Sequence, residues 1–167
     1  GSPKFGLNVA STGSDVLTNT ERAGVVYRFD GTTGQLLQTF GHPRGQVSFG
    51  DTIVGRGNEV IIGAPFTDTV ATDVGEAYVF DLTTGALRLT LPNPEPDFRD
   101  MFGRAIATIG NNILVGAPGE NERASPGVVY LFDGTTGGLL ATISNPAPND
   151  FDFFGQSIAV MGNNILI

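Results

Sequence analysis

The side chains that could do chemistry in this sequence are almost all carboxylates. Aspartate and glutamate number 17, against nine lysines and arginines, one histidine and no cysteine. Without cysteine there is no thiolate nucleophile, no disulfide and no cysteine-based zinc site. A chain supplied mainly with carboxylates suits cation binding and loop-holding hydrogen bonds better than hydrolytic or redox catalysis. The net charge of −8 also disfavours nucleic acid and anionic membrane surfaces as partners.

Many of the carboxylates fall in or beside four stretches of the chain. These stretches are 66–74, 92–101, 118–126 and 144–153. Oxygen ligands of this kind suit calcium where neighbouring stretches converge. A solvated acidic rim that keeps the protein soluble is the alternative interpretation. The candidate metal ligands are Asp68, Asp73, Glu76, Asp97, Asp100, Asp150 and Asp152, and Glu95 belongs to the same acidic set.

The same stretches contain candidates for binding a partner. They are Phe66, Phe98, Phe151, Glu120 and Glu122. A phenylalanine exposed in a loop can anchor a partner, whereas one packed beneath the loop only plugs it. We favour the plug interpretation for the three phenylalanines, and exposure would instead make them anchors.

A repeated unit must position these residues. Four similar segments open with Phe-Gly, at Phe5, Phe49, Phe102 and Phe154. The last three openings are 53 and 52 residues apart, and the first copy is the weakest match. A Tyr-x-Phe-Asp segment also recurs, at Tyr27, Tyr78 and Tyr130. Self-similarity at this period predicts a repeat architecture.

Each unit predicts four strands and no helix. In the third copy, runs of apolar, β-branched and aromatic residues predict strands over 103–109, 112–116, 127–132 and 138–143. Gly-Asn pairs predict two-residue hairpins between the first two strands, at 57–58, 110–111 and 162–163. Four antiparallel strands in about 52 residues are typical of a propeller blade, and a β-sandwich is the rival fold.

Several repeated residues have structural interpretations. We expect turn-holding carboxylates, and not a ring of ligands, at Asp30, Asp81 and Asp133. The Phe-Gly phenylalanines and the three tyrosines are expected to form the core between blades. His42 takes the place of Asn93 and Asn145, each followed by proline, so we interpret it as a turn residue and not as a catalytic base.

We therefore predict an all-β fold made of four-stranded antiparallel β-propeller blades. Residues 1–167 would form one propeller segment, with blades at approximately 5–40, 49–91 and 102–143 and a half-blade at 154–167. The longer connections join second to third strands and fourth to first strands. They therefore share one face, and this is the face where we expect function.

The unit resembles the FG-GAP repeat of integrin α-subunit propellers, and most of all bacterial forms with short hairpins. The likeness is carried by Phe-Gly, by Gly-Asn-Asn-Ile-Leu-Val-Gly-Ala-Pro at 110–118 and by Gly-Val-Val-Tyr-Leu-Phe-Asp at 127–133. It covers 49–167 well and 5–48 in part. The resemblance implies a β-propeller at the cell surface or outside the cell, with recognition or adhesion as its function.

Many members of this family bind calcium through an Asp-x-Asp-x-Asp-Gly loop between the first two strands. This chain departs from that pattern, because two-residue hairpins cannot wrap six to eight oxygens around a cation. We expect no metal at the family's calcium position and no other cofactor. Calcium bound weakly by the long-loop carboxylates is the alternative.

The leading hypothesis is a non-enzymatic module that presents its long loops to a protein or glycan. One alternative is a quinoprotein-like propeller enzyme, which the Tyr-x-Phe-Asp-Gly-Thr-Thr-Gly-x-Leu-Leu segment faintly suggests, although the chain has no tryptophan to dock its blades. Another is a structural scaffold without a ligand of its own. The sequence has no apolar run long enough to cross a membrane and no basic-then-apolar leader, so membrane insertion is not expected.

Three blades and a half do not close a ring, since closed propellers generally need four to eight blades. We expect either a fragment of a longer propeller or association with other copies of the chain. In the second case residues 154–167 would complete a blade with 24–40 of a neighbour, because the inner strands of the first copy look degenerate. Two chains would then form a six-bladed ring.

Overall fold

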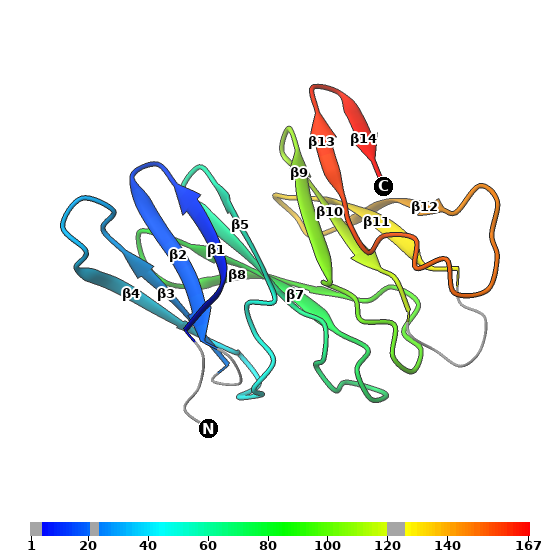
Figure 1. Cartoon of the computed structure of the whole chain (residues 1–167), viewed down its shortest axis with the longest axis horizontal. Helices are drawn as coiled ribbons and strands as arrows, with labels where there is room; N and C mark the ends of the chain where they lie inside the picture. The colour runs from blue at the N-terminus through cyan, green and yellow to red at the C-terminus, as the bar shows by residue number, and fades with distance from the viewer. Residues whose placement is uncertain (1–4, 21–23, 120–125) are drawn as a thin grey trace.

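Strands make up the regular structure of this protein. The computed structural model describes residues 5–20, 24–119 and 126–167, and this part of the chain contains fourteen strands and no helix. The strands form three four-stranded antiparallel sheets and one two-stranded hairpin (Figure 1). The all-β prediction is therefore confirmed. In the described ranges no helix is long and apolar enough to span a membrane.

Each four-stranded sheet is one blade, and its strands pair in chain order. Blade 1 contains β1 (Phe5–Thr12), β2 (Asp15–Thr20), β3 (Val25–Phe29) and β4 (Leu36–Gly41). Blade 2 contains β5 (Thr52–Arg56), β6 (Glu59–Ala64), β7 (Glu76–Asp81) and β8 (Leu87–Pro92). Blade 3 contains β9 (Ala105–Ile109), β10 (Asn112–Ala117), β11 (Val128–Asp133) and β12 (Leu139–Ser144). The half-blade contains β13 (Ala159–Met161) and β14 (Asn164–Leu166).

The first strands of the blades lie along a common inner edge. β1 contacts β5, β5 contacts β9, and β9 contacts β13. The fourth strands, β4, β8 and β12, lie at the outer edges of their sheets. The blades therefore fan out from the inner strands, and three blades with a half-blade leave the ring open (Figure 1).

Short turns close one end of every blade. Two-residue turns join the first and second strands as predicted, and their glycines have φ values of 56° to 61°. The turns between third and fourth strands are held by Asp30, Asp81 and Asp133. Each carboxylate accepts two backbone N–H bonds of 2.7 to 2.9 Å from the threonines that follow it. These bonds hold the pKa of the three carboxyls below its usual range, and the turn-holding interpretation is confirmed.

Apolar side chains fill the spaces between blades. We call the contact between blades 1 and 2 the first junction, and that between blades 2 and 3 the second junction. The first junction is centred on Phe49, whose ring lies 6.0 Å from those of Tyr78 and Phe80. The second is centred on Phe102, whose ring lies 5.9 Å from those of Tyr130 and Phe132. Phe49 and Phe102 are buried, so both are core residues as predicted.

Glycines allow the second junction to close tightly. Gly63 in β6 lies against Gly103, and a Cβ on Gly63 would be 2.1 Å from the Gly103 carbonyl oxygen. The same distance separates a Cβ on Gly116 from the carbonyl oxygen of Gly155 in the next unit. No side chain fits at these positions without moving backbone. The glycine of Gly-Ala-Pro in one unit therefore lies directly against the Phe-Gly of the next. We call this contact the glycine seat.

Arginines join the blades at the face that carries the short turns. Arg28 of blade 1 donates to the Leu82 carbonyl of blade 2. Arg56 of blade 2 donates to the carbonyls of Asn111 (2.8 Å) and Gly134 (3.1 Å) in blade 3. Each arginine also pairs with the acid that begins the second strand of its own blade. These acids are Asp15 and Glu59.

Blade 1 differs from the expectation drawn from sequence. Its inner strands are complete, because β1 pairs with β2 and β2 pairs with β3 from Val16↔Phe29 to Asn19↔Val26. The expectation that the inner strands of this copy are degenerate is therefore wrong, since β2 already occupies the inner edge of β3. The pairing of 154–167 with 24–40 of a neighbour stays a prediction. The threonines make the sequence of β2 look less apolar than the second strands of the other copies. The segment is nevertheless a strand, and it buries Leu17 on its other face.

Candidate functional site

The long connections share one face of the blades, as the alternation of antiparallel strands requires. They leave the end opposite the short turns (Figure 1). We call this end the long-loop face. Its described connections are 42–51, 65–75, 93–104 and 145–158, with the ends of a further connection at 118–119 and 126–127.

Two candidate metal ligands support the loops that contain them. Asp100 accepts bonds from the Asn93 side chain (2.7 Å) and from the Asp97 N–H (2.6 Å). Asp152 repeats this arrangement in the next unit and accepts a bond of 2.8 Å from Asn145. Burial raises the pKa of the Asp100 carboxyl despite these bonds. Both carboxylates therefore hold the shape of their own connections.

Three further candidates also bond to nearby residues. Glu76 is buried and accepts bonds of 2.8 and 2.9 Å from the Arg44 guanidinium, together with one from the Tyr78 hydroxyl. Burial and the bond to Glu76 raise the pKa of Tyr78 well above its usual value. Asp68 accepts the Asp73 N–H at 2.9 Å, which folds the connection between β6 and β7 on itself.

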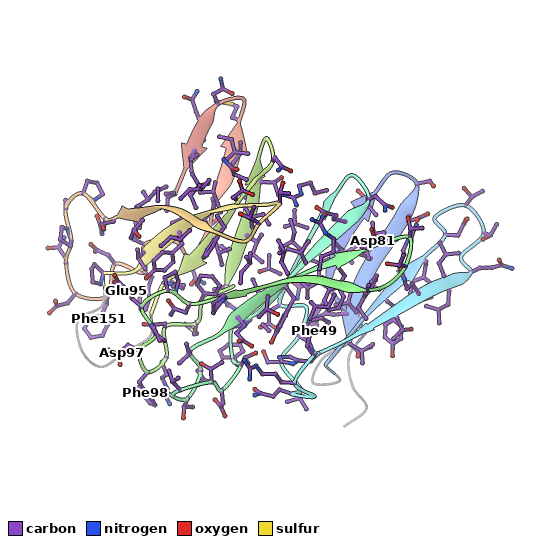
Figure 2. All side chains as sticks on the ribbon, turned by 180° about the vertical axis from the view of Figure 1, so that it is seen from behind. Phe49, Asp81, Glu95, Asp97, Phe98 and Phe151 are labelled. Carbon is purple, nitrogen blue, oxygen red and sulfur yellow. The ribbon has the colours of Figure 1, made fainter. Side chains whose placement is uncertain are left out.

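The remaining acidic candidates are not gathered at one point. Glu95, Asp97 and Asp150 are exposed, and Figure 2 shows the first two on one side of the molecule. Glu120 and Glu122 lie outside the described residues. In the ranges that the structure describes, no group of three or more His, Asp or Glu side chains is placed to hold a metal ion.

The three candidate phenylalanines are exposed, so the plug interpretation is wrong for them. Phe66, Phe98 and Phe151 are 39%, 43% and 56% exposed. Figure 2 shows Phe98 and Phe151 on the same side of the molecule. The Arg99 guanidinium lies over the Phe98 ring, 5.0 Å from its centroid. Phe151 has a φ of 63°, a left-handed conformation uncommon outside glycine.

His42 is a buried member of the first junction. Its Nδ1 accepts the Arg44 N–H at 3.0 Å, and its Nε2 lies 2.9 Å from the Thr67 hydroxyl oxygen. Because Nδ1 accepts, Nε2 carries the proton and donates to Thr67. The residue is 7% exposed, and burial lowers the pKa of its imidazole. His42 is thus a neutral structural group in a turn.

A cavity of about 400 Å³ opens at the first junction on the long-loop face. It lies between the start of β1, the end of β2 and the connections that precede β5 and follow β6. Its apolar lining includes Leu7, Val47 and Phe66, and its polar lining includes Asn8 and Asp51. The volume falls in the range of small-molecule pockets. We call it the junction cavity.

Polar groups that lack partners also lie at the junction cavity. Thr20 Oγ1 and Ser48 Oγ are buried without a hydrogen-bond partner among the described residues. An unpaired buried hydroxyl costs about 1–3 kcal/mol, and a polar ligand recovers this only if the lining shifts to expose the oxygen. Asp51 lies 3.7 Å from Arg104, and burial raises the pKa of the Asp51 carboxyl.

Differences between the copies of the repeat explain why this cavity lies at the first junction. The equivalent positions in the first and second junctions are Asn19 and Gly63, Thr20 and Ala64, and Ser48 and Met101. Ala64 and Met101 are buried at the second junction. Asn19 carries a side chain where the second junction has none, so β2 stands further from Gly50 than β6 stands from Gly103.

These three departures are visible in the sequence. They lie where the repeat is broken, whereas the candidates for chemistry were drawn from repeated residues and from the long connections. A position-by-position comparison of the copies is the signal that could have found the cavity.

The comparisons with known proteins assign no family. No protein-family model matches the chain, and no curated protein matches it. The function must therefore be inferred from the fold and from the long-loop face.

Proposed function

We propose that this chain is a non-enzymatic recognition module of the FG-GAP, integrin-α-like type, which binds a protein or glycan through its long-loop face. The observation that carries the proposal is the junction cavity, a ligand-sized space that opens on this face beside the exposed Phe66. Exposed aromatic side chains next to a cavity are typical anchors for a ligand.

The repeat motifs support the FG-GAP part of the proposal because they have a common structural purpose here. Phe49 and Phe102 fill the first and second junctions, and Gly63 lies directly against the Phe-Gly of the following unit. The motif residues thus act together as the connector between blades.

Recognition fits the available side chains better than catalysis. His42, the single histidine, is buried and bonded to Thr67. General acid–base chemistry near neutral pH needs an accessible group whose pKa lies close to 7. The chain instead offers exposed phenylalanines and a cavity with unpaired hydroxyls. A scaffold without a ligand of its own is the alternative that binding experiments would reveal.

Ligand capture tests the proposal. The immobilised chain would be probed with a glycan array and with extracellular proteins, alongside a variant carrying Phe66→Ser, Phe98→Ser and Phe151→Ser. A matched control carries Leu36→Ser and Leu87→Ser, which replace exposed residues on outer strands near the short turns. We expect the first variant to lose the ligand and the control to keep it. Equal binding by all three proteins would overturn the placement of the site, and no binding by any would favour the scaffold.

We also propose a cell-surface or extracellular setting, and a ring completed by other copies or by further propeller residues. In the described chain β14 pairs only with β13, and Met161 and Leu166 are exposed on this hairpin. An open strand edge with apolar neighbours favours pairing with another strand. Sedimentation equilibrium tests self-association, since a folded 17.4 kDa monomer at high concentration would exclude it. Labelling of intact cells with a membrane-impermeant reagent tests the location.

A further inference from the structure

We propose that the junction cavity binds one neutral sugar residue of a glycan. The inference rests on the proposed recognition function and names the chemistry of its ligand. The cavity measures about 400 Å³, enough for a small molecule. It opens on the long-loop face, so the remainder of a glycan attached to the bound residue could extend into solvent.

The lining combines apolar walls with polar groups. Leu7, Val47 and Phe66 are exposed apolar side chains that can cover the C–H face of a pyranose ring. Asn8, Asn19 and Asp51 supply polar groups to the lining, and the Thr20 and Ser48 hydroxyl oxygens, unpaired in the described structure, lie just behind it, shielded from solvent until the lining shifts. A hydroxyl both donates and accepts, so it can satisfy a sugar hydroxyl in either orientation. A ligand with many hydroxyls and one apolar face matches this combination.

The charge of the cavity disfavours anionic ligands. Asp51 is the one charged side chain among the described residues that line it. Its partner Arg104 lines a neighbouring cavity of about 330 Å³ between the inner strands, and does not line this one. Among the described lining residues, a ligand carboxylate or phosphate would therefore meet the Asp51 carboxylate and no cation. A neutral sugar can instead donate hydroxyl hydrogens to the carboxylate, and such charge-assisted bonds are strong.

One site is expected per chain. At the second junction the position of Ser48 is held by Met101, which is 2% exposed, and no side chain fits at Gly63. Transferring Met101 into the first junction, as Ser48→Met, should fill the cavity without disturbing the strands. Met101 has a left-handed φ of 52° that Ser48 does not share, so this variant tests the volume of the cavity and does not reproduce the backbone of the second junction.

The test uses the full chain and free monosaccharides. Neutral probes are glucose, galactose, mannose, fucose and N-acetylglucosamine, and acidic probes are glucuronic acid and N-acetylneuraminic acid. A short arginine-containing peptide serves as a basic probe. Saturation-transfer NMR and calorimetry should find a neutral sugar bound at one site per chain, with a Kd on the order of 1 mM. Ser48→Met should weaken binding about tenfold or more, with a melting temperature within a few degrees of that of the parent. Ser144→Met, at an exposed serine, should change neither.

The proposal is overturned if the acidic sugars or the basic peptide bind in preference, or if folded Ser48→Met binds the neutral sugar unchanged. If Ser48→Met does not fold, Phe66→Ala takes its place and should weaken binding about fivefold. Capture of a protein through the long-loop phenylalanines without any sugar binding would reject the sugar site and leave the recognition function standing. Failure of both experiments would reject both proposals.

Discussion

The two junctions between blades share one arrangement, and they differ at the long-loop face, where the junction cavity opens at the first. Both are centred on a Phe-Gly phenylalanine and both are joined by an arginine at the short-turn face. The second junction seats Gly103 against Gly63 and buries Met101, whereas the first has Asn19 and Ser48 at the matching positions.

This difference shows that the contacts that hold blades together can be separated from those that close the face. The aromatic core and the arginines are present at both junctions, so they hold neighbouring blades in place. Of these two junctions, only the second has the glycine contact and the buried methionine. A binding cavity can therefore arise at a junction without loss of its core. The following predictions test this separation, from the largest expected effect to the smallest.

Gly63→Ala should disrupt the second junction most severely. The new Cβ would lie 2.1 Å from the Gly103 carbonyl oxygen, so backbone must move. We expect a loss of about 3 kcal/mol or more in the free energy of unfolding, measured by urea denaturation. Gly41→Ala is the control, because nothing lies within 4 Å of its added Cβ, and it should be nearly neutral. If Gly63→Ala left the free energy of unfolding unchanged, the glycine seat would not be what closes the second junction.

Arg56→Ala should destabilise the chain by about 2–3 kcal/mol, because it leaves Glu59 without this partner and two carbonyls of blade 3 without a donor. Arg28→Ala should have a similar effect at the first junction. Lysine at either position should rescue only part of the loss, since it cannot reproduce the planar set of donors. Denaturation curves for the four variants measure this. A large effect at one junction alone would contradict a shared role for the arginines.

Met101→Ser should open the second junction to resemble the first. Removing a buried methionine should cost about 2 kcal/mol of unfolding free energy, because a cavity replaces its side chain. Ser48→Met, the reverse exchange, should be within about 1 kcal/mol of the parent if it fills existing space. Thermal melts of both variants check this asymmetry. Equal losses in the two variants would mean that the first junction holds no usable space.

The smallest effect concerns pH at the first junction. Burial lowers the pKa of His42 from its ordinary value of 6.5, so the unfolded chain binds the proton more readily than the folded chain. The stability that neutral His42 supports is complete above pH 6.5 and is lost as the pH falls from 6.5 towards the lowered folded pKa. His42→Asn, which installs the residue found at Asn93, should remove this loss.

Urea denaturation of the parent and of His42→Asn at several pH values between about 7 and 5 measures the difference. The carboxylates are common to both proteins, so their titration cancels in the comparison. Parallel pH profiles would show that His42 does not report on the first junction.

The blade fold was predictable because its signals are local. Strand alternation, the Gly-Asn hairpins and the turns held by Asp30, Asp81 and Asp133 act within a few residues of one another. The error at blade 1 arose because β2 has Thr18, Asn19 and Thr20 where β6 has Ile62, Gly63 and Ala64. Threonine is β-branched and favours strands although it is polar.

The candidate site was harder to predict because it depends on residues distant in sequence. The carboxylates of Asp100 and Asp152 attracted attention by their number, but backbone and asparagine donors of their own loops engage them. The junction cavity combines Leu7, Ser48 and Phe66, which only the packing of blades brings together.

The glycine seat has a consequence for how such chains change in length over evolution. The second and third units carry this glycine in their second strands, at Gly63 and Gly116, together with a Phe-Gly at their own starts. A unit duplicated as a whole therefore brings both halves of the connection with it. The number of blades can then grow or shrink by recombination without the invention of a new interface. A new binding cavity then needs only single substitutions at one junction, like those at Asn19 and Ser48.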